Sequence, residues 1–438
     1  MSLNPELRRN LWLELTLHRL IAMPAVLLLV FGLTFVLNRD APGEPLAGAA
    51  AILFIAICAV WGTVHAGDAV MSEVRGHTWD AQRMSAVAPW PMTLGKLAGA
   101  TAFAWYGGLI CVAVFVLCSG AGNAPQLTGL MLASAVLFQT LALIGGIAAA
   151  RKGMVRASTG GWAVALLFLF GGPSIGMLGG EEAGVTWWGR EWSRIDFLLY
   201  SVVLFAGWAV LGAHRLMCQE LQVRTLPWAW VAFLLFIAAF ISGFAIRHAD
   251  GWTQVRNVHF VGGLVVSLVA VYPLLFAEAG APMAVRRILF HLRAGDRRRA
   301  LEEAPLWPLT LALAALFTLF TIFLTGGNSA EGSLLAAAQL APLPLLLLAL
   351  RDTAIFMLFA FAARPRRVEA AAILYLVLLY GLVPAILRAI EADTLADLVL
   401  PPFWDRPGYA ATIAAVHAAL AVSAAVWRWR ANYAIKLN

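Results

Sequence analysis

The chain has 438 residues, of which 61% are hydrophobic and 13% are charged, with a net charge of +7 and a mean hydropathy of +0.81. A soluble protein carries about 25% charged residues, and a soluble core cannot hide this much apolar surface, so the composition excludes a soluble enzyme. It also excludes intrinsic disorder, which requires low hydrophobicity and high charge. The long apolar runs predict an all-α polytopic membrane protein, because only helices and closed barrels satisfy the backbone inside a bilayer.

The first predicted element is an amphipathic segment over residues 5–19. Leu7, Leu11 and Leu15 form one stripe along it, which favours an N-terminal helix lying in the membrane interface. Apolar runs of about the 20 residues that a bilayer requires then follow to the end of the chain. The twelve expected spans cover residues 20–37, 47–66, 97–118, 127–149, 161–180, 196–213, 228–246, 257–277, 306–325, 334–350, 368–387 and 409–427.

The basic residues predict the orientation of these spans. An even number of spans places both termini on one side, and 24 of the 31 Lys and Arg residues fall in the tails and loops on that side. The positive-inside rule therefore predicts cytoplasmic termini in a bacterial-type inner (plasma) membrane. Basic loops beside anionic lipid account for the sequence pI of about 9.6, so we expect membrane lipid as a partner and no nucleic acid.

The loops predict an internal duplication into two six-helix halves, 1–225 and 226–438. Each half has a long inner loop after its second span, a short basic inner loop after its fourth, and an outer loop rich in Trp, Pro and acid after its fifth. Residues 88–94 read Ala-Pro-Trp-Pro-Met-Thr-Leu and are similar to Ala-Pro-Leu-Trp-Pro-Leu-Thr-Leu at 304–311. Because six is even, the two repeats are parallel. This layout is typical of major-facilitator-like carriers and of two-half ABC permeases.

The first long inner loop, residues 68–96, carries a motif. Glu73 is followed by Gly76 and Thr78, then by Pro89, and the loop ends with Gly95 and Lys96. This pattern resembles the type-2 ABC exporter permeases, whose first inner loop carries Glu-x-x-x-Gly-Thr, a short helix, a break with Pro, and Gly-Lys at the start of the third span. One residue separates Gly76 from Thr78, which departs from the family pattern. The second long loop, 278–305, matches in layout but lacks Gly-Thr.

The resemblance implies that the chain is the transmembrane permease subunit of an ABC transporter, with two copies of a separate ATP-binding subunit as partners. The chain has no GxxxxGK[ST] phosphate loop, so we expect no enzyme activity and no cofactor here, with ATP and Mg on the partner. A coupling helix in 68–96, and less typically in 278–305, would stand in a groove of the ATP-binding subunit and transmit force between the subunits. Its charged residues would pair across that contact, and Trp79, Met84 and Val87 would dock in the groove. The expected coupling residues are Glu73, Arg75, Gly76, Thr78, Asp80, Arg83, Glu278 and Arg286.

Two structural alternatives stay open at the membrane surfaces. The segment 68–96 could be an ordinary interfacial helix. The outer segments 181–196 and 388–406 resemble the short re-entrant helices of the family, but their Trp residues suit a plain aromatic belt equally well. One copy of the chain per transporter is expected from the fused halves, and a homodimer is also open.

Few ionisable or amide side chains fall within the expected spans, where such groups are functional candidates by default. For Gln139 and His417, the alternative is a hydrogen bond to a neighbouring helix. We expect Arg351 and Asp352 to end the tenth span at residue 350, with 353–363 as an interfacial helix; the alternative is an ion pair within a longer span. The intramembrane polar candidates are His65, Gln139, Arg351, Asp352 and His417.

The sequence shows no pattern typical of a metal site, a catalytic site or a proton pathway. The eight His residues and four Cys residues show no metal-ligand spacing, and no catalytic set is evident. No chain of membrane carboxylates appears, which disfavours a proton-coupled carrier. Faces rich in Ala, Gly and Leu favour export of an amphipathic or lipid-like substrate. The alternatives are a secondary transporter with parallel repeats and a membrane assembly protein without a transport cycle.

Overall fold

The structure is a computed structural model that is almost entirely helical. The chain divides into two compact units, Met1–Val185 with Glu191–Thr225, and Thr186–Arg190 with Leu226–Asn438. Apart from Thr186–Arg190, which belongs to the second unit, the boundary between the units falls between Thr225 and Leu226. The described residues are 4–120, 122–151, 153, 184–245, 252–278, 282–325, 342–362, 368–403 and 405–433.

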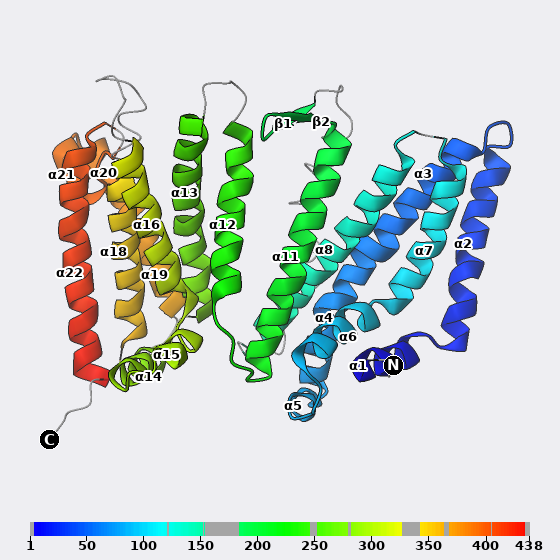
Figure 1. The fold of residues 1–438 in the computed structure, drawn as a ribbon, viewed down its shortest axis with the longest axis horizontal. Helices are drawn as coiled ribbons and strands as arrows, with labels where there is room; N and C mark the ends of the chain where they lie inside the picture. Colours follow the sequence, from blue (N-terminus) through cyan, green and yellow to red (C-terminus); the bar gives the residue numbers. More distant parts are fainter. Residues whose placement is uncertain are drawn as a thin grey trace. The chain divides into compact units, whose positions relative to one another are not determined.

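The first unit begins with a short helix that lies across the ends of longer ones (Figure 1). A seven-residue π-helix, η1, interrupts the long helix formed by α3 and α4. The elements of this unit are α1 (Pro5–Glu14), α2 (Leu17–Leu37), α3 (Gly43–Phe54), η1 (Ile55–Trp61), α4 (Gly62–Arg75), α5 (Trp79–Arg83), α6 (Pro89–Ala100), α7 (Ala102–Cys118), α8 (Ala124–Arg151) and α11 (Arg194–Glu220).

The second unit also contains a π-helix, η4, between α19 and α20. Two short strands, β1 (Val185–Trp187) and β2 (Arg190–Trp192), precede α11 and pair with each other. The helices of this unit are α12 (Trp228–Ser242), η3 (Gly243–Ala245), α13 (Trp252–Glu278), α14 (Pro282–Arg293), α15 (Arg297–Glu302), α16 (Leu306–Thr325), α18 (Pro342–Ala360), α19 (Val368–Val377), η4 (Leu378–Leu382), α20 (Val383–Ala389), α21 (Asp393–Val399) and α22 (Pro407–Tyr433).

The helices make this chain a multi-pass membrane protein. In the described part of the chain, nine helices are long and apolar enough to cross a bilayer, or ten if α6 and α7, bent by 59°, form one broken span. The expected span at 161–180 lies outside the described residues, as does part of 334–350. The span expected at 228–246 corresponds to α12, which has only 15 residues. The count of twelve and the internal repeat therefore stay predictions.

Small residues allow the helices to pack closely. In the first unit α8 packs along both α4 and α11, and in the second unit α18 packs along α22. Gly146 of α8 leaves room for the Gly67 carbonyl of α4, which a Cβ would displace. Large apolar side chains such as Leu28 and Leu29 instead point outward, as expected for helices that face lipid.

Arg351 and Asp352 lie inside a span and not at its end. The tenth span was expected to end at residue 350, but α18 continues through both residues to Ala360. The side chains lie near the middle of the helix and are buried, with 3% and 2% of their surface exposed. The helix tolerates them because they neutralise each other in an ion pair.

Candidate functional site

The predicted motif residues Glu73, Gly76 and Thr78 form the C-terminal cap of α4. The Thr78 N–H donates to the Glu73 carbonyl at 3.0 Å, and the His77 N–H donates to the Val74 carbonyl at 3.2 Å. His77 has a φ of 56°, so it holds the left-handed position of a Schellman cap, which is usually glycine. The residue inserted between Gly76 and Thr78 is therefore the one that stops α4 and turns the chain into α5.

Two glycines of α6 allow α1 to pack directly against it. A Cβ added to Gly95 would lie 2.6 Å from the Glu6 Cβ, and one added to Gly99 would lie 2.5 Å from the Asn10 Cβ. Glu6 and Asn10 are four residues apart, as are the two glycines, so one helix face fits the other. The Asn10 side chain also donates to the Gly95 carbonyl at 3.3 Å.

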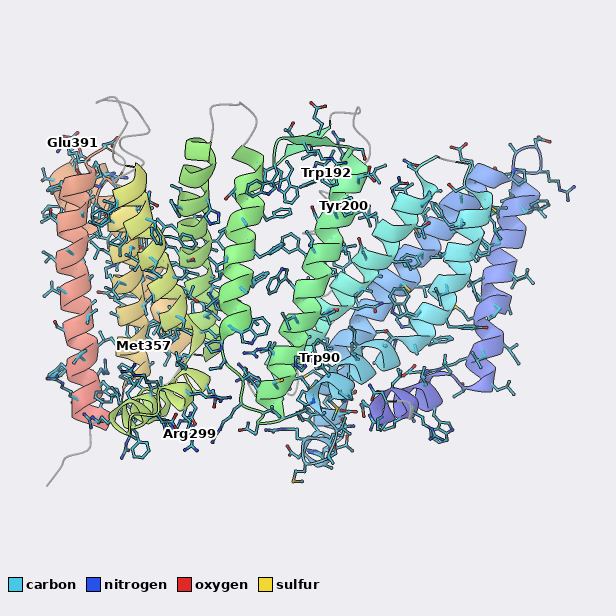
Figure 2. The ribbon with its side chains drawn as sticks, in the orientation of Figure 1. Trp90, Trp192, Tyr200, Arg299, Met357 and Glu391 are labelled. Atoms are coloured by element: carbon cyan, nitrogen blue, oxygen red, sulfur yellow. The ribbon has the colours of Figure 1, made fainter. Side chains whose placement is uncertain are left out.

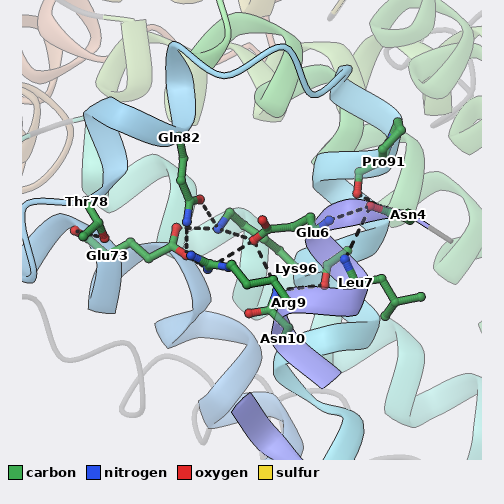
Figure 3. Close-up of polar contacts among 11 residues, drawn as sticks. Asn4, Glu6, Leu7, Arg9, Asn10, Glu73, Thr78, Gln82, Pro91 and Lys96 are labelled. Atoms are coloured by element: carbon green, nitrogen blue, oxygen red, sulfur yellow. Dashed lines mark hydrogen bonds and ion pairs between the residues drawn. The ribbon is translucent and has the colours of Figure 1, made fainter. Parts of the chain in front are cut away.

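A group of five polar side chains, named here the Lys96 network, joins these elements (Figure 3). Glu6, Glu73 and Lys96 are buried, whereas Arg9 closes the group at the surface with 42% of its side chain exposed. Lys96 is 1% exposed, and its Nζ donates to Glu73, to Glu6 at 3.1 Å and to Gln82 Oε1 at 2.8 Å. Arg9 pairs with Glu73 and, at 3.4 Å, with Glu6. Gln82 Nε2 donates to Glu73 Oε1 at 2.6 Å. The network consists of Glu6, Arg9, Glu73, Gln82 and Lys96.

The charges of the Lys96 network balance. Two carboxylates face two cations, so each buried charge has a partner of opposite sign. Breaking a buried pair costs about 3–5 kcal/mol because it leaves an uncompensated charge. The Lys96 ammonium also lies 5.1 Å from the centre of the Trp79 ring. The network therefore ties α1, α4, α5 and α6 into one assembly.

The structure separates the coupling candidates into buried and outward-facing residues. Glu73 is buried within the Lys96 network, and Trp79 is buried in the apolar core of the unit. The sequence predicted that Glu73 pairs with another subunit and that Trp79 docks in it. Because both side chains are buried within this unit, neither is placed to do so. Asp80 and Met84 do face outward, with 86% of the Asp80 side chain and 83% of Met84 exposed.

The remaining candidates of the first loop make contacts within the unit. Arg75 pairs with Asp68 at 2.5 Å. Arg83 Nε donates to the Glu220 carbonyl at 3.1 Å, and its Nη1 lies 3.5 Å from an oxygen of Asp80. Arg83 thus connects α5 to the C-terminal end of α11.

A cavity of about 300 Å³ opens beside α5. Its charged lining residues are Asp80 and Arg83 from the first loop, together with Arg151 and Glu220 from the ends of α8 and α11. Arg151 and Glu220 pair at 3.3 Å. Side chains of both signs therefore lie next to the exposed surface of α5, where a charged residue of another chain could bind.

The second long loop is built differently. Glu278 is the last residue of α13, and its side chain lies outside the described residues. Arg286 is exposed on the amphipathic helix α14. In the described part of this loop, Glu303 lies 3.5 Å from Arg287 and 3.6 Å from His291. Arg298 pairs with Glu302 at 3.0 Å and Arg299 with Asp296 at 3.2 Å, and the three arginines are largely exposed.

The intramembrane candidates Gln139, His65 and His417 differ in their contacts. Gln139 accepts from Trp105 Nε1 at 2.9 Å and donates to the Cys58 carbonyl at 3.0 Å, which is the structural role weighed for it. The His65 ring meets the edge of Trp61 at 5.2 Å. His417 lies on α22, and its Nδ1 is buried without a hydrogen-bond partner among the described residues.

Aromatic side chains also gather near chain turns, as Figure 2 shows for Trp192 and Tyr200, whose ring centres lie 5.1 Å apart. Trp90, the second residue of α6, stacks on His214, with ring centres 3.9 Å apart. Residues 181–183 and 404 of the two outer segments lie outside the described part. In the first outer segment, residues 185–192 form the paired strands β1 and β2, so the short re-entrant helix expected there is wrong for the described residues. The second outer segment contains the short helix α21, and there the re-entrant and aromatic-belt interpretations both stay open.

Sequence reasoning missed Glu6, Arg9 and Gln82 as site residues, and it named Lys96 only as part of the motif. One signal was available, because Glu6 and Asn10 have the same four-residue spacing as Gly95 and Gly99. That spacing predicts a close helix pair only if α1 and α6 are known to meet. The meeting itself depends on the tertiary fold.

Comparison with known proteins gives no family for this chain. No protein-family model, no curated protein and no solved structure matches it. In the described part of the chain, no group of three or more His, Cys, Asp or Glu residues is arranged to hold a metal ion. The function is therefore inferred from the residues and their geometry.

Proposed function

We propose that this chain is the permease subunit of an ATP-driven ABC transporter that exports an amphipathic or lipid-like substrate. It would work with two copies of a separate ATP-binding subunit, which supplies ATP and Mg. The observation that carries the proposal is the ion pair between Glu73 and Lys96. These residues stand at the two ends of the motif that resembles the type-2 exporters, and the fold brings them together.

The Lys96 network supports a mechanical role for the loop. Asp80 and Met84 of α5 face outward, where a partner can push on them. Gln82 of the same helix bonds to Glu73 and Lys96 on the inner side. Charge-assisted hydrogen bonds are short and strong, so displacement of α5 would pass to the ends of α4 and α6 without a flexible joint.

The second loop would contribute less to coupling. It is expected to act through Glu278 and Arg286, but α14 and α15 carry mostly exposed basic side chains instead of a buried network. We therefore propose an asymmetric transporter, in which the first half couples strongly to ATP hydrolysis and the second mainly completes the pathway.

Co-purification tests the proposal first. The chain, extracted in a mild detergent, should retain a protein that has a phosphate loop and an ABC signature. Recovery of the chain with no ATPase, combined with transport by the chain alone in liposomes under an ion gradient, would instead establish a secondary transporter. If the chain has no ATPase partner and carries out no transport, the result would favour a membrane assembly protein.

Substitution then tests the network in the complex. The double variant Glu73→Gln with Lys96→Met removes one charge of each sign, so the fold keeps its charge balance. We expect ATP hydrolysis to continue while transport per ATP falls at least tenfold. The control is Asp68→Asn, which removes an exposed pair with Arg75. Equal transport by the double variant and the control would refute coupling through Lys96.

The proposed asymmetry has its own comparison. Glu73→Ala should reduce ATP-coupled transport more than Glu278→Ala does. Equal losses would show that both loops couple alike.

A further inference from the structure

A charged cluster lies in the second unit at the midpoint of α18. Arg351 Nε and Nη2 donate to Asp352 Oδ1 at 2.9 and 2.8 Å. Both side chains are almost completely buried. Ionisable residues at this depth of a span are expensive and mark substrate or ion pathways, so the pair calls for a functional explanation.

Asp352 is fully satisfied by the chain itself. Its second oxygen, Oδ2, accepts from the Tyr272 hydroxyl at 2.8 Å and from the Tyr380 hydroxyl at 2.7 Å. The Arg351 guanidinium also lies 4.9 Å from the centre of the Tyr380 ring. The carboxylate thus receives bonds from α13, α18 and η4 and has no need of a further donor.

Arg351 is not satisfied in the same way. Its Nη1 is buried and has no hydrogen-bond partner among the described residues. A guanidinium nitrogen can only donate, and a buried donor without an acceptor costs about 1–3 kcal/mol, more when it is charged. The described chain therefore leaves an acceptor to be supplied from outside it.

Among the described residues, a second buried atom without a hydrogen-bond partner lies on the neighbouring helix. His417 Nδ1, on α22, is also buried without a partner in the described part of the chain. The helices α18 and α22 pack along each other, and the Arg351 charge acts on the His417 imidazole. An imidazole N–H can donate a hydrogen bond, as a guanidinium N–H can, so an anionic oxygen bound between the two helices would accept from both groups.

The backbone beside the cluster is also unusual. Tyr380 belongs to the π-helix η4 (Leu378–Leu382), and π-helical turns are rare and occur frequently at functional sites. The extra residue of such a turn changes the direction of the side chains that follow it. Here the turn carries a residue that bonds directly to Asp352.

We propose that Arg351 Nη1 and His417 bind one anionic oxygen group, a carboxylate or a phosphate, of an amphipathic molecule between α18 and α22. The molecule could be the transported substrate or a resident lipid, which share this chemistry. The identification of the ligand as a transported substrate rests on the proposed function. Binding itself involves this chain alone.

The test measures thermal unfolding of the purified full chain in neutral detergent, without any ATPase. Dodecanoate should raise the unfolding temperature saturably, whereas dodecanol, which has the same tail without the charge, should not. His417→Phe should weaken dodecanoate binding at least tenfold. The matched control is Tyr272→Phe, which removes a bond to Asp352 only and should retain the dodecanoate effect.

Several results would overturn this proposal. Equal stabilisation by dodecanol would show that the tail alone binds, and inorganic phosphate acting as strongly as dodecanoate would show that the ligand need not be amphipathic. Wild-type affinity in a folded His417→Phe variant would also refute the site. If that variant does not fold, Arg351→Lys replaces it, since it keeps the charge but lacks Nη1, and it should weaken binding at least tenfold.

The source of the ligand is tested by transport. If dodecanoate is carried by the reconstituted complex and competes with transport, it is a substrate analogue. If it binds without competing, the site holds a lipid and the assignment of substrate class is wrong. Failure to find an ATPase partner would overturn the proposed function and leave this binding result unchanged.

Discussion

His77, the residue inserted into the motif, occupies the left-handed position that ends α4. The residue sits at a φ of 56°, where a side chain costs roughly 1–2 kcal/mol relative to a right-handed conformation. Gly76 precedes this position and has an ordinary negative φ. The glycine of the motif is thus displaced by one residue from the place where glycine is most useful.

His77→Gly should therefore raise the free energy of unfolding by about 1 kcal/mol, because glycine adopts positive φ without strain. Chemical denaturation of the purified chain would measure the change. His77→Val is the opposing variant and should destabilise, since a β-branched residue is a poor fit at this φ. A destabilising glycine would mean that the imidazole contributes more than the backbone strain removes.

Lys96 is the residue whose loss should matter most to stability. Lys96→Ala leaves Glu6 and Glu73 facing each other with Arg9 as their remaining cation, and we expect a loss of about 3–5 kcal/mol. Arg75→Ala, which breaks an exposed pair, should cost less than about 1 kcal/mol. Denaturation midpoints of the two variants give the comparison. Similar midpoints would show that the buried ion pairs of Lys96 stabilise the fold no more than the exposed pair of Arg75 does.

At the scale of elements, the contact of α1 with α6 depends on the absence of two side chains. Gly95→Ala would place a methyl group 2.6 Å from the Glu6 Cβ and 2.9 Å from the Leu7 backbone nitrogen. Because a backbone atom cannot swing aside, α1 must move. Faster hydrogen exchange along Pro5–Glu14 would report this movement. Gly48→Ala is the control, since an added Cβ there meets nothing within 4 Å.

The helix α14 makes a separate prediction about lipid. Phe290 and Leu292 are exposed beside Arg286 and Arg293, a combination typical of a helix lying at an anionic membrane surface. Each such arginine contributes about 1 kcal/mol of attraction near the surface. Anionic phospholipid should therefore stabilise the chain in nanodiscs more than neutral lipid does, and Arg286→Gln with Arg293→Gln should remove most of that difference.

Long apolar helices could be predicted from the sequence, but their irregularities could not. The expected spans 127–149 and 409–427 lie within α8 and α22, which extend a few residues further at each end. The 59° bend between α6 and α7 and the π-helices η1 and η4 depend on packing against other helices. The predicted position of Arg351 and Asp352 at the end of a span was wrong for the same reason. The Tyr272 and Tyr380 hydroxyls that bond to Asp352 come from distant parts of the chain.

At the scale of the whole molecule, the expected parallel repeat predicts which loops share a side of the membrane. Single cysteines at Asp80 and Arg299, one from each long loop, should react with a membrane-impermeant reagent only from the cytoplasmic side. A cysteine at Glu391 should react only from the outside. Labelling of intact and opened cells distinguishes the two, and reaction of positions 80 and 299 from opposite sides would exclude a parallel arrangement.

The burial of the Lys96 network has a consequence for ionic strength. Mobile ions screen exposed charges over about 8 Å at physiological salt but act much less on buried pairs. A contact made through the exposed Asp80 should therefore weaken as salt is added, while the link from Gln82 to Glu73 and Lys96 persists. High salt would thus release the proposed ATP-binding subunit from this chain while leaving α5 fixed to the spans behind it.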